Sequence, residues 1–128
     1  MRILLIGVGT VGEAIARLAA DRDWCEAMVL ADVDASRADV LARKLGDPER
    51  FPAISLDASS TDAVAAAARE HHVDLVMNAV DPRFVMPIFE GALAAGVHYI
   101  DMANSLSKPH PDRPFSEPGL KLGDEQFA

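Results

Sequence analysis

The chain has 128 residues, half of them hydrophobic and a quarter charged, which suits one globular domain with a buried core. Twenty acidic against twelve basic side chains give a formal net charge of −8, which argues against a nucleic-acid partner because phosphate binding needs a basic face. No stretch approaches the ~20 apolar residues of a membrane-spanning helix, and the single cysteine cannot form an internal disulfide. We therefore expect a cytoplasmic protein with no nucleic-acid partner and no membrane segment.

The first predicted element is an apolar strand over residues 2–6, which runs into three glycines at the spacing G-x-G-x-x-G. If a dinucleotide binds here, each glycine has a physical role. Gly7 lets the chain turn sharply, Gly9 lets the backbone approach a pyrophosphate, and Gly12 lets the following helix pack closely. The same spacing also arises by chance in loops of small Ala- and Gly-rich domains, so the surrounding elements must support it.

A helix is expected to follow, beginning near Thr10 and Val11. Its free N–H groups and the positive end of its dipole would face the pyrophosphate, so no basic side chain is required there.

The second strand is expected over about residues 26–32 and closes on Asp32, twenty residues after Gly12. An acid at this place accepts hydrogen bonds from the adenosine ribose and repels a 2′-phosphate, which favours NAD over NADP. Arg37 lies close enough in sequence to accommodate that phosphate, although it also suits a solvated position in the first turn of the next helix.

The remaining pattern alternates helices and strands. Ser36 is a plausible cap for the second helix, and Gly46 ends it. The alternation predicts parallel pairing with right-handed crossovers, hence a three-layer, Rossmann-type doubly wound α/β fold whose strand order begins 3-2-1-4-5. The predicted elements are helices over 36–45, 63–70 and 84–95 and strands over 51–56, 73–78 and 97–101.

Glycine or polar residues close all five strands, at the edge of the sheet where ligands bind in this fold. Asp57 either contacts adenine or caps the third helix, and Asn78 either contacts a ligand or bonds its own loop. Asp101 is better suited to orienting the loop after the fifth strand. The strand ends are Gly7, Asp32, Asp57, Asn78 and Asp101.

After this α/β domain, which we place at residues 1–105, the periodicity ends. Residues 106–128 are expected to be a proline-rich linker and the start of a truncated following segment. Within it, residues 108–119 are expected to be extended, and 120–128 could begin a helix.

Residues 74–82 and 92–101 resemble the amino-terminal cofactor domain of saccharopine dehydrogenase-like oxidoreductases, and the resemblance covers about residues 1–105. Three motifs carry it: Asn78-Ala79 closing the fourth strand, Ala95-Gly96 ending a helix, and Tyr99-Ile100-Asp101. The resemblance implies an NAD(P)-binding domain, and the carboxylate of Asp32 makes NAD the expected cofactor, with NADP less favoured. The resemblance also implies pyrophosphate contacts from Gly9, Thr10, Val11 and Gly12, ribose contacts from Asp32 and Val33, adenine contacts from Asp57 and Ala58, nicotinamide-side ribose contacts from Asn78, Ala79 and Val80, and a nicotinamide contact from Met102.

Members of this family normally continue into a second domain that supplies substrate-binding and catalytic groups. We therefore assign no catalytic residue to this chain, and we assign no metal site to it either. For the complete enzyme, the resemblance implies hydride transfer at an amine or imine carbon of a small, amino-acid-derived substrate. A homodimer is compatible with this interpretation. The alternative is a non-catalytic, NAD(H)-sensing regulatory Rossmann module, which residues beyond Ala128 would distinguish from an enzyme.

Overall fold

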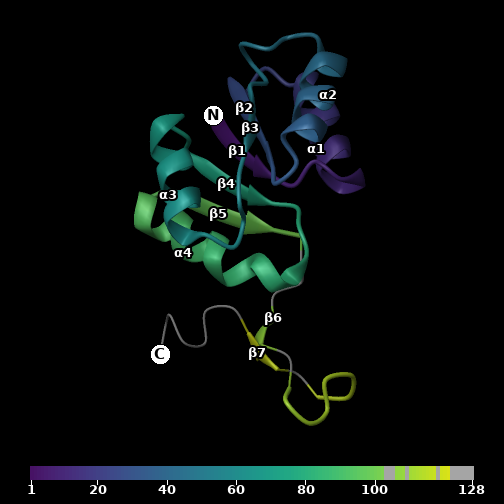
Figure 1. The fold of residues 1–128 in the computed structure, drawn as a ribbon, viewed down its shortest axis with the longest axis vertical. Coiled ribbons are helices and arrows are strands. Elements are labelled where there is room, and N and C mark those ends of the chain that lie inside the picture. The colour runs from purple at the N-terminus through teal and green to yellow at the C-terminus, as the bar shows by residue number, and fades with distance from the viewer. Residues whose placement is uncertain (103–105, 109, 118, 122–128) are drawn as a thin grey trace.

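The computed structural model describes residues 1–102, 106–108, 110–117 and 119–121. Figure 1 shows a parallel sheet of five strands in the order β3-β2-β1-β4-β5, and a separate antiparallel pair, β6 and β7. The predicted Rossmann-type fold and strand order are thus confirmed. The elements are β1 (Arg2–Ile6), α1 (Thr10–Ala20), β2 (Ala27–Asp32), α2 (Ala35–Leu45), β3 (Ala53–Ser55), α3 (Thr61–Glu70), β4 (Leu75–Asn78), the 3₁₀ helix η1 (Pro82–Phe84), α4 (Val85–Ala95), β5 (His98–Asp101), β6 (Leu106–Lys108) and β7 (Leu120–Lys121).

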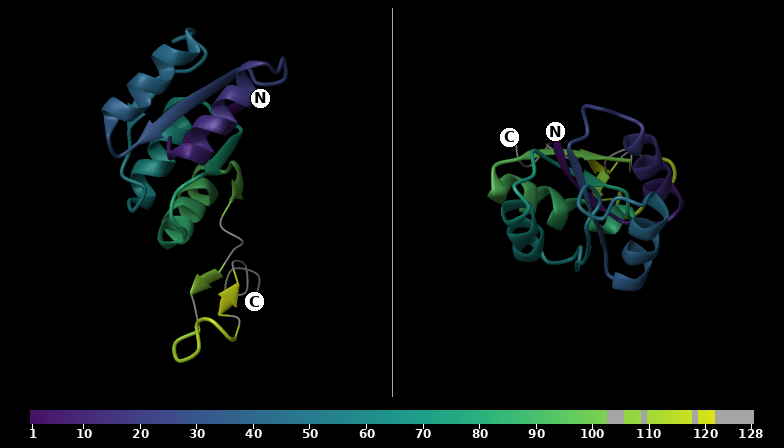
Figure 2. Two further views of the ribbon diagram at one scale, coloured as in Figure 1. Left: turned by 90° about the vertical axis from the view of Figure 1, so that its right-hand side faces the viewer. Right: turned by 90° about the horizontal axis from the view of Figure 1, so that it is seen from above.

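The helices cover the sheet from both sides, as the views in Figure 2 show. Helices α1 and α2 pack on one face, against side chains such as Ile3, Leu5 and Leu30. Helices α3 and α4 pack on the other, against Leu4 and Ile6 among others. Alternate β1 residues thus enter two cores, which explains why this strand is apolar throughout. Each such buried side chain contributes roughly 1.5–3 kcal/mol through removal from water.

The parallel register brings the predicted site together. Ile6 of β1 pairs with Ala31 of β2 on one side and with Asn78 of β4 on the other. Two backbone hydrogen bonds continue these ladders past the strand ends, from Gly7 N–H to the Ala31 carbonyl (2.8 Å) and from Ala79 N–H to the Ile6 carbonyl (2.9 Å). The end of β1 is therefore fixed between its two neighbours.

Two of the predicted helix caps are wrong. The cap of α2 is Asp34, whose carboxylate accepts a hydrogen bond from the Ser36 N–H at 2.9 Å, while Ser36 itself lies inside the helix. The cap of α3 is Ser60 and not Asp57. A capping side chain must stand immediately before the first helical residue. Helix α2 begins at Ala35, before Ser36, whereas α3 begins at Thr61, four residues after Asp57.

Residues after 105 also differ from expectation. The described part contains β6 and β7, paired antiparallel, where the sequence predicts an extended loop and the beginning of a helix. The prolines lie between these strands and not within them, which leaves the backbone N–H groups of the strands available for pairing. Leu120 and Lys121 are in a strand, so a helix does not begin there, and the rest of the expected helix, 122–128, lies outside the described residues.

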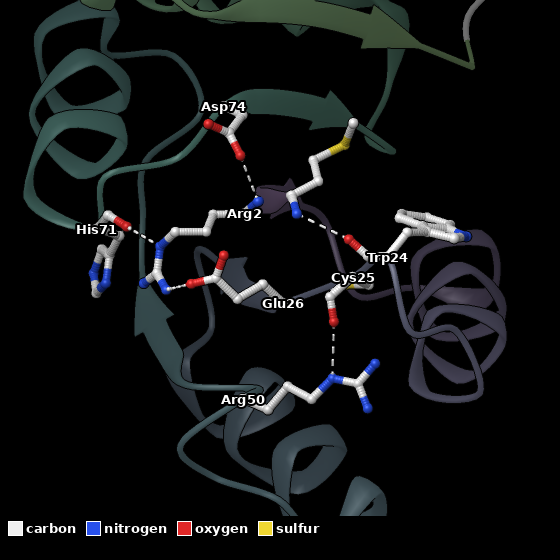
Figure 3. A network of polar contacts seen from close by, with 8 residues as sticks. Arg2, Trp24, Cys25, Glu26, Arg50, His71 and Asp74 are labelled. Atoms are coloured by element: carbon white, nitrogen blue, oxygen red, sulfur yellow. Dashed lines mark hydrogen bonds and ion pairs between the residues drawn. The ribbon is translucent and has the colours of Figure 1, made fainter.

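Arg50 holds together the edge of the sheet opposite the carboxyl ends of the strands. Its guanidinium donates to the carbonyls of Ala19, Ala20, Arg22 and Cys25, at 2.8 to 3.1 Å. Two of these carbonyls, those of Ala19 and Ala20, belong to the last turn of α1, and the Ala19 carbonyl also accepts from the Arg22 N–H at 3.0 Å. Figure 3 shows Arg50 reaching Cys25.

Arg2 joins three segments on the same edge. Its backbone N–H donates to Asp74 (2.7 Å), its Nε donates to the His71 carbonyl (3.2 Å), and its Nη1 pairs with Glu26 at 3.0 Å (Figure 3). These contacts tie the beginnings of β1, β2 and β4 together. Across the described residues, no helix is both long and apolar enough to cross a membrane.

Candidate functional site

The glycine turn after β1 is shaped by two close approaches. Gly7 has φ +95°, a conformation that side-chain-bearing residues rarely adopt, and a Cβ on Gly7 would collide with Cγ1 of Val80 and lie 2.9 Å from the Ala79 carbonyl oxygen. A Cβ on Gly12 would collide with the carbonyl oxygen of Gly7. The first turn of α1 therefore lies directly against the glycine turn, and only glycine permits this.

Gly9 has a different environment. It is the N-terminal cap residue of α1, without a side-chain cap, and a Cβ on it would meet no atom closer than Nη2 of Arg37, at 3.6 Å. The N–H groups of Thr10, Val11 and Gly12 occupy the first helical positions, where no helical carbonyl is available. The amino end of α1 thus offers donors and a positive dipole end to an anion.

Thr10, the first residue of α1, borders a cleft of about 460 Å³ between the glycine turn and the beginning of α2. Predicted site residues Gly9 and Thr10 line it. So does Arg37, whose 2′-phosphate role the sequence left open. The other lining residues, which the sequence analysis did not predict, are Val8, Glu13, Ser36 and Val40. Val8, Glu13 and Ser36 adjoin Gly7, Gly12 and Arg37 in the sequence, and Val40 follows Arg37 by three residues, about one helical turn, so these positions were the available signal.

Asp32 lies at the base of this region with 7% of its surface exposed. Its Oδ2 accepts a hydrogen bond from the Val8 N–H (3.1 Å), and its Oδ1 accepts one from the Asp34 N–H (3.1 Å). Nη1 of Arg37 lies 3.9 Å from Oδ2. The carboxylate therefore orders the glycine turn and is paired with a cation, while its remaining lone pairs can still accept a ribose hydroxyl. Val33, the other predicted ribose contact, is exposed.

Glu13 places a second carboxylate in the cleft. Arg17 donates to it at 2.7 Å and Lys44 at 3.5 Å, and the hydrogen bond from Arg17 is the main cause that holds the pKa of Glu13 below its ordinary value. These two cations offset the repulsion that Glu13 would exert on a bound phosphate.

At the end of β3, Asp57 is exposed and binds its own turn. Its Oδ1 accepts from the Ser59 hydroxyl (2.7 Å) and from the Ser59 N–H (2.9 Å), and these bonds lower the pKa of Asp57. Neighbouring Ala58 packs against the α3–α4 side of the sheet. Adenine contact by these two residues stays a prediction.

At the end of β4, Asn78 is buried, with 1% of its surface exposed. Its Nδ2 donates to the Tyr99 hydroxyl (3.1 Å), and its Oδ1 accepts from the Val80 N–H (3.0 Å). Local loop bonding, one of the two roles left open by the sequence, is therefore present, while ribose contact by Asn78, Ala79 and Val80 stays a prediction. The pairing of Asn78 with Tyr99 was not predicted from the sequence, in which the two residues are 21 positions apart.

Met102 follows the end of β5 and is exposed. Its N–H donates to the Asn78 carbonyl at 3.3 Å, which extends the β4–β5 pairing. Its nicotinamide contact stays a prediction.

Solved structures of several dehydrogenases are similar to this chain in fold. Saccharopine dehydrogenase (L-Glu forming) from Saccharomyces cerevisiae superposes with a TM-score of 0.68 at 21% identity, over 84% of this chain and 22% of that one. UDP-N-acetylglucosamine 3-dehydrogenase from Acidithiobacillus ferrooxidans gives a TM-score of 0.56 at 30% identity, over 79% of this chain and 29% of that one. The first of these likenesses concerns the fold alone, because the identity is low.

A curated relative is similar in sequence. Carboxyaminopropylagmatine dehydrogenase from Synechocystis sp. is 26% identical over 103 residues, which are 80% of this chain and 26% of the relative. This chain therefore spans about a quarter of the length of that protein. The family model described as "Saccharopine dehydrogenase NADP binding domain" matches residues 3–121, nearly the whole chain. With the glycine turn, the strand order and this match in agreement, the chain belongs to the saccharopine dehydrogenase NADP-binding domain family.

Proposed function

We propose that this domain binds a nicotinamide dinucleotide for an NAD(P)-dependent oxidoreductase. The observation that carries the proposal is the amino end of α1, which has no side-chain cap and borders the cleft beside a turn that only glycine can form. In contrast, the carboxylate of Asp34 caps α2 and the hydroxyl of Ser60 caps α3. A pyrophosphate would accept hydrogen bonds from the uncapped N–H groups without any basic residue.

We further propose NADP as the preferred cofactor, in place of the NAD that Asp32 alone favours. The repulsion between Asp32 and a 2′-phosphate is weakened because Arg37 lies 3.9 Å from the carboxylate. The guanidinium of Arg37 lines the same cleft as the glycine turn, so a 2′-phosphate there would find a cation. The description of the family model is consistent with this assignment.

The proposed reaction is hydride transfer at an amine or imine carbon of an amino-acid-derived substrate. The nicotinamide supplies the hydride or accepts it, and the residues of this domain bind and orient the cofactor. Support comes from the relatives, whose names describe dehydrogenases of saccharopine and of carboxyaminopropylagmatine.

Calorimetric titration with NADPH and NADH tests both parts of the proposal. The wild type is expected to bind NADPH more tightly, and Arg37→Ala to lose that preference by about tenfold, because one phosphate contact of roughly 1.5 kcal/mol is removed. Arg43→Ala is the matched control, since Arg43 lies near the other end of the same helix and does not line the cleft. Tighter binding of NADH by the wild type would overturn the NADP assignment, and binding of neither nucleotide would overturn the proposed function.

A further inference from the structure

A polar pair, the buried Asn78 and the partly buried Tyr99, joins the ends of β4 and β5. The Asn78 amide is held at both of its ends, by the Tyr99 hydroxyl at 3.1 Å and by the Val80 N–H at 3.0 Å. The side chain of Tyr99 is in turn fixed by the ring of Phe89, which meets it edge to face with the centroids 5.5 Å apart. Burial is the main cause that raises the pKa of Tyr99 above its ordinary value.

The Val80 N–H can only donate, so it requires Oδ1 of Asn78, and Nδ2 is thereby directed at the Tyr99 hydroxyl, to which it donates. Without that hydroxyl, the amide nitrogen would lose a partner in a site with almost no access to water, and the amide could leave Val80 to find another.

Val80 contacts both the Asn78 side chain and the glycine turn. Its Cγ1 occupies the space into which a Cβ of Gly7 would project, and the preceding residue, Ala79, donates to the Ile6 carbonyl at 2.9 Å. The loop after β4 thus forms one wall of the glycine turn. In this fold a dinucleotide crosses the sheet between β1 and β4, where the strand order reverses, with one mononucleotide half on each side.

We infer that Tyr99 is a positioning residue for the nicotinamide half of the cofactor, acting through Asn78 to hold Ala79 and Val80 against the glycine turn. The inference rests on the proposed function. Its distinguishing consequence is that Tyr99 matters for a ligand that extends past the glycine turn to β4, and not for one confined to the side of β1, β2 and β3.

The test compares NADPH with adenosine 2′,5′-bisphosphate, which lacks the nicotinamide half, on the wild type and on Tyr99→Phe. The variant removes only the hydroxyl. We expect its dissociation constant for NADPH to rise about tenfold, as for one buried amide left without a partner, and its affinity for adenosine 2′,5′-bisphosphate to stay within about twofold. An Asn78→Ala variant and the double variant complete the cycle. If Tyr99 acts through Asn78, the double variant loses no more NADPH affinity than Asn78→Ala alone.

A second measurement needs no ligand. Hydrogen exchange at the Val80 amide should accelerate about tenfold in Tyr99→Phe, relative to the amide of Met28 in the core of β2. Equal weakening of both nucleotides, or unchanged NADPH binding, would overturn the inference. Should the wild type bind neither nucleotide, the proposed function fails, and unchanged exchange at Val80 would separately refute the positioning role.

Discussion

Val8 and Asp32, 24 residues apart in the sequence, are joined by a hydrogen bond of 3.1 Å from the Val8 N–H to the buried Asp32 carboxylate. The residue at the end of β2 therefore holds the glycine turn in place before any ligand binds. This relationship gives Asp32 a structural role beside the predicted ribose contact.

Asp32→Ala and Asp32→Asn should separate these two roles. The alanine variant leaves the buried Val8 N–H without an acceptor and should lower the free energy of unfolding by about 2 kcal/mol. The asparagine variant keeps an oxygen for that N–H but loses the charge, so it should cost less than about 1 kcal/mol while binding NADPH better relative to NADH. Urea unfolding and calorimetry check both expectations. Equal destabilisation by the two variants would contradict the role in the turn.

Gly9→Ala should weaken dinucleotide binding, whereas Gly12→Ala should lower the stability of the fold. A Cβ at Gly9 meets nothing closer than 3.6 Å, so this variant should fold normally but bind the dinucleotide at least tenfold more weakly, because the methyl group occupies the pyrophosphate position. A Cβ at Gly12 collides with the Gly7 carbonyl, so that variant should be destabilised by at least about 3 kcal/mol. Circular dichroism melts and NADPH titration distinguish the two outcomes. Normal NADPH binding by Gly9→Ala would place the pyrophosphate elsewhere.

Arg50→Lys should destabilise the fold without changing the site. One ammonium group cannot reach four carbonyls, and two of the abandoned carbonyls end α1. We expect a loss of about 2 kcal/mol in urea unfolding, with NADPH affinity unchanged once the protein is folded. Arg43→Lys serves as the control on an exposed arginine. A loss equal to that of the control would show that the carbonyl contacts contribute little.

Alkaline pH should destabilise the protein through Tyr99, its single tyrosine. Burial raises the pKa of this side chain above its ordinary value of 10, so the folded state holds the proton more tightly than the unfolded state does. The contribution is fully present below about pH 10 and is lost as the pH rises above that value. Unfolding free energies measured at about pH 8 and about pH 11 should therefore fall more steeply for the wild type than for Tyr99→Phe. Parallel pH profiles would contradict this expectation.

Much of the architecture could be predicted from local patterns. Apolar strands alternate with amphipathic helices, and that alternation leaves few arrangements other than a parallel doubly wound sheet. The glycine turn could also be predicted, from the G-x-G-x-x-G spacing. The structure explains the first of these glycines, because φ is +95° at Gly7 and residues with a side chain rarely adopt that angle. The cap of α2 was misplaced by two residues because helix ends depend on backbone angles that the apolar pattern does not specify.

The contacts that define the site were decided by tertiary structure. Tyr99 lies 21 residues from Asn78, and Arg37 reaches both the Asp32 carboxylate and the space above Gly9. The pairing of β6 with β7 likewise joins segments that the sequence indicated to be a linker. Sequence periodicity reports which face of an element is buried, whereas the partner of a polar side chain depends on strand register and on the approach of distant segments. The sequence by itself determined the fold and the position of the glycine turn, and only the folded chain decided which polar groups hold that turn in place.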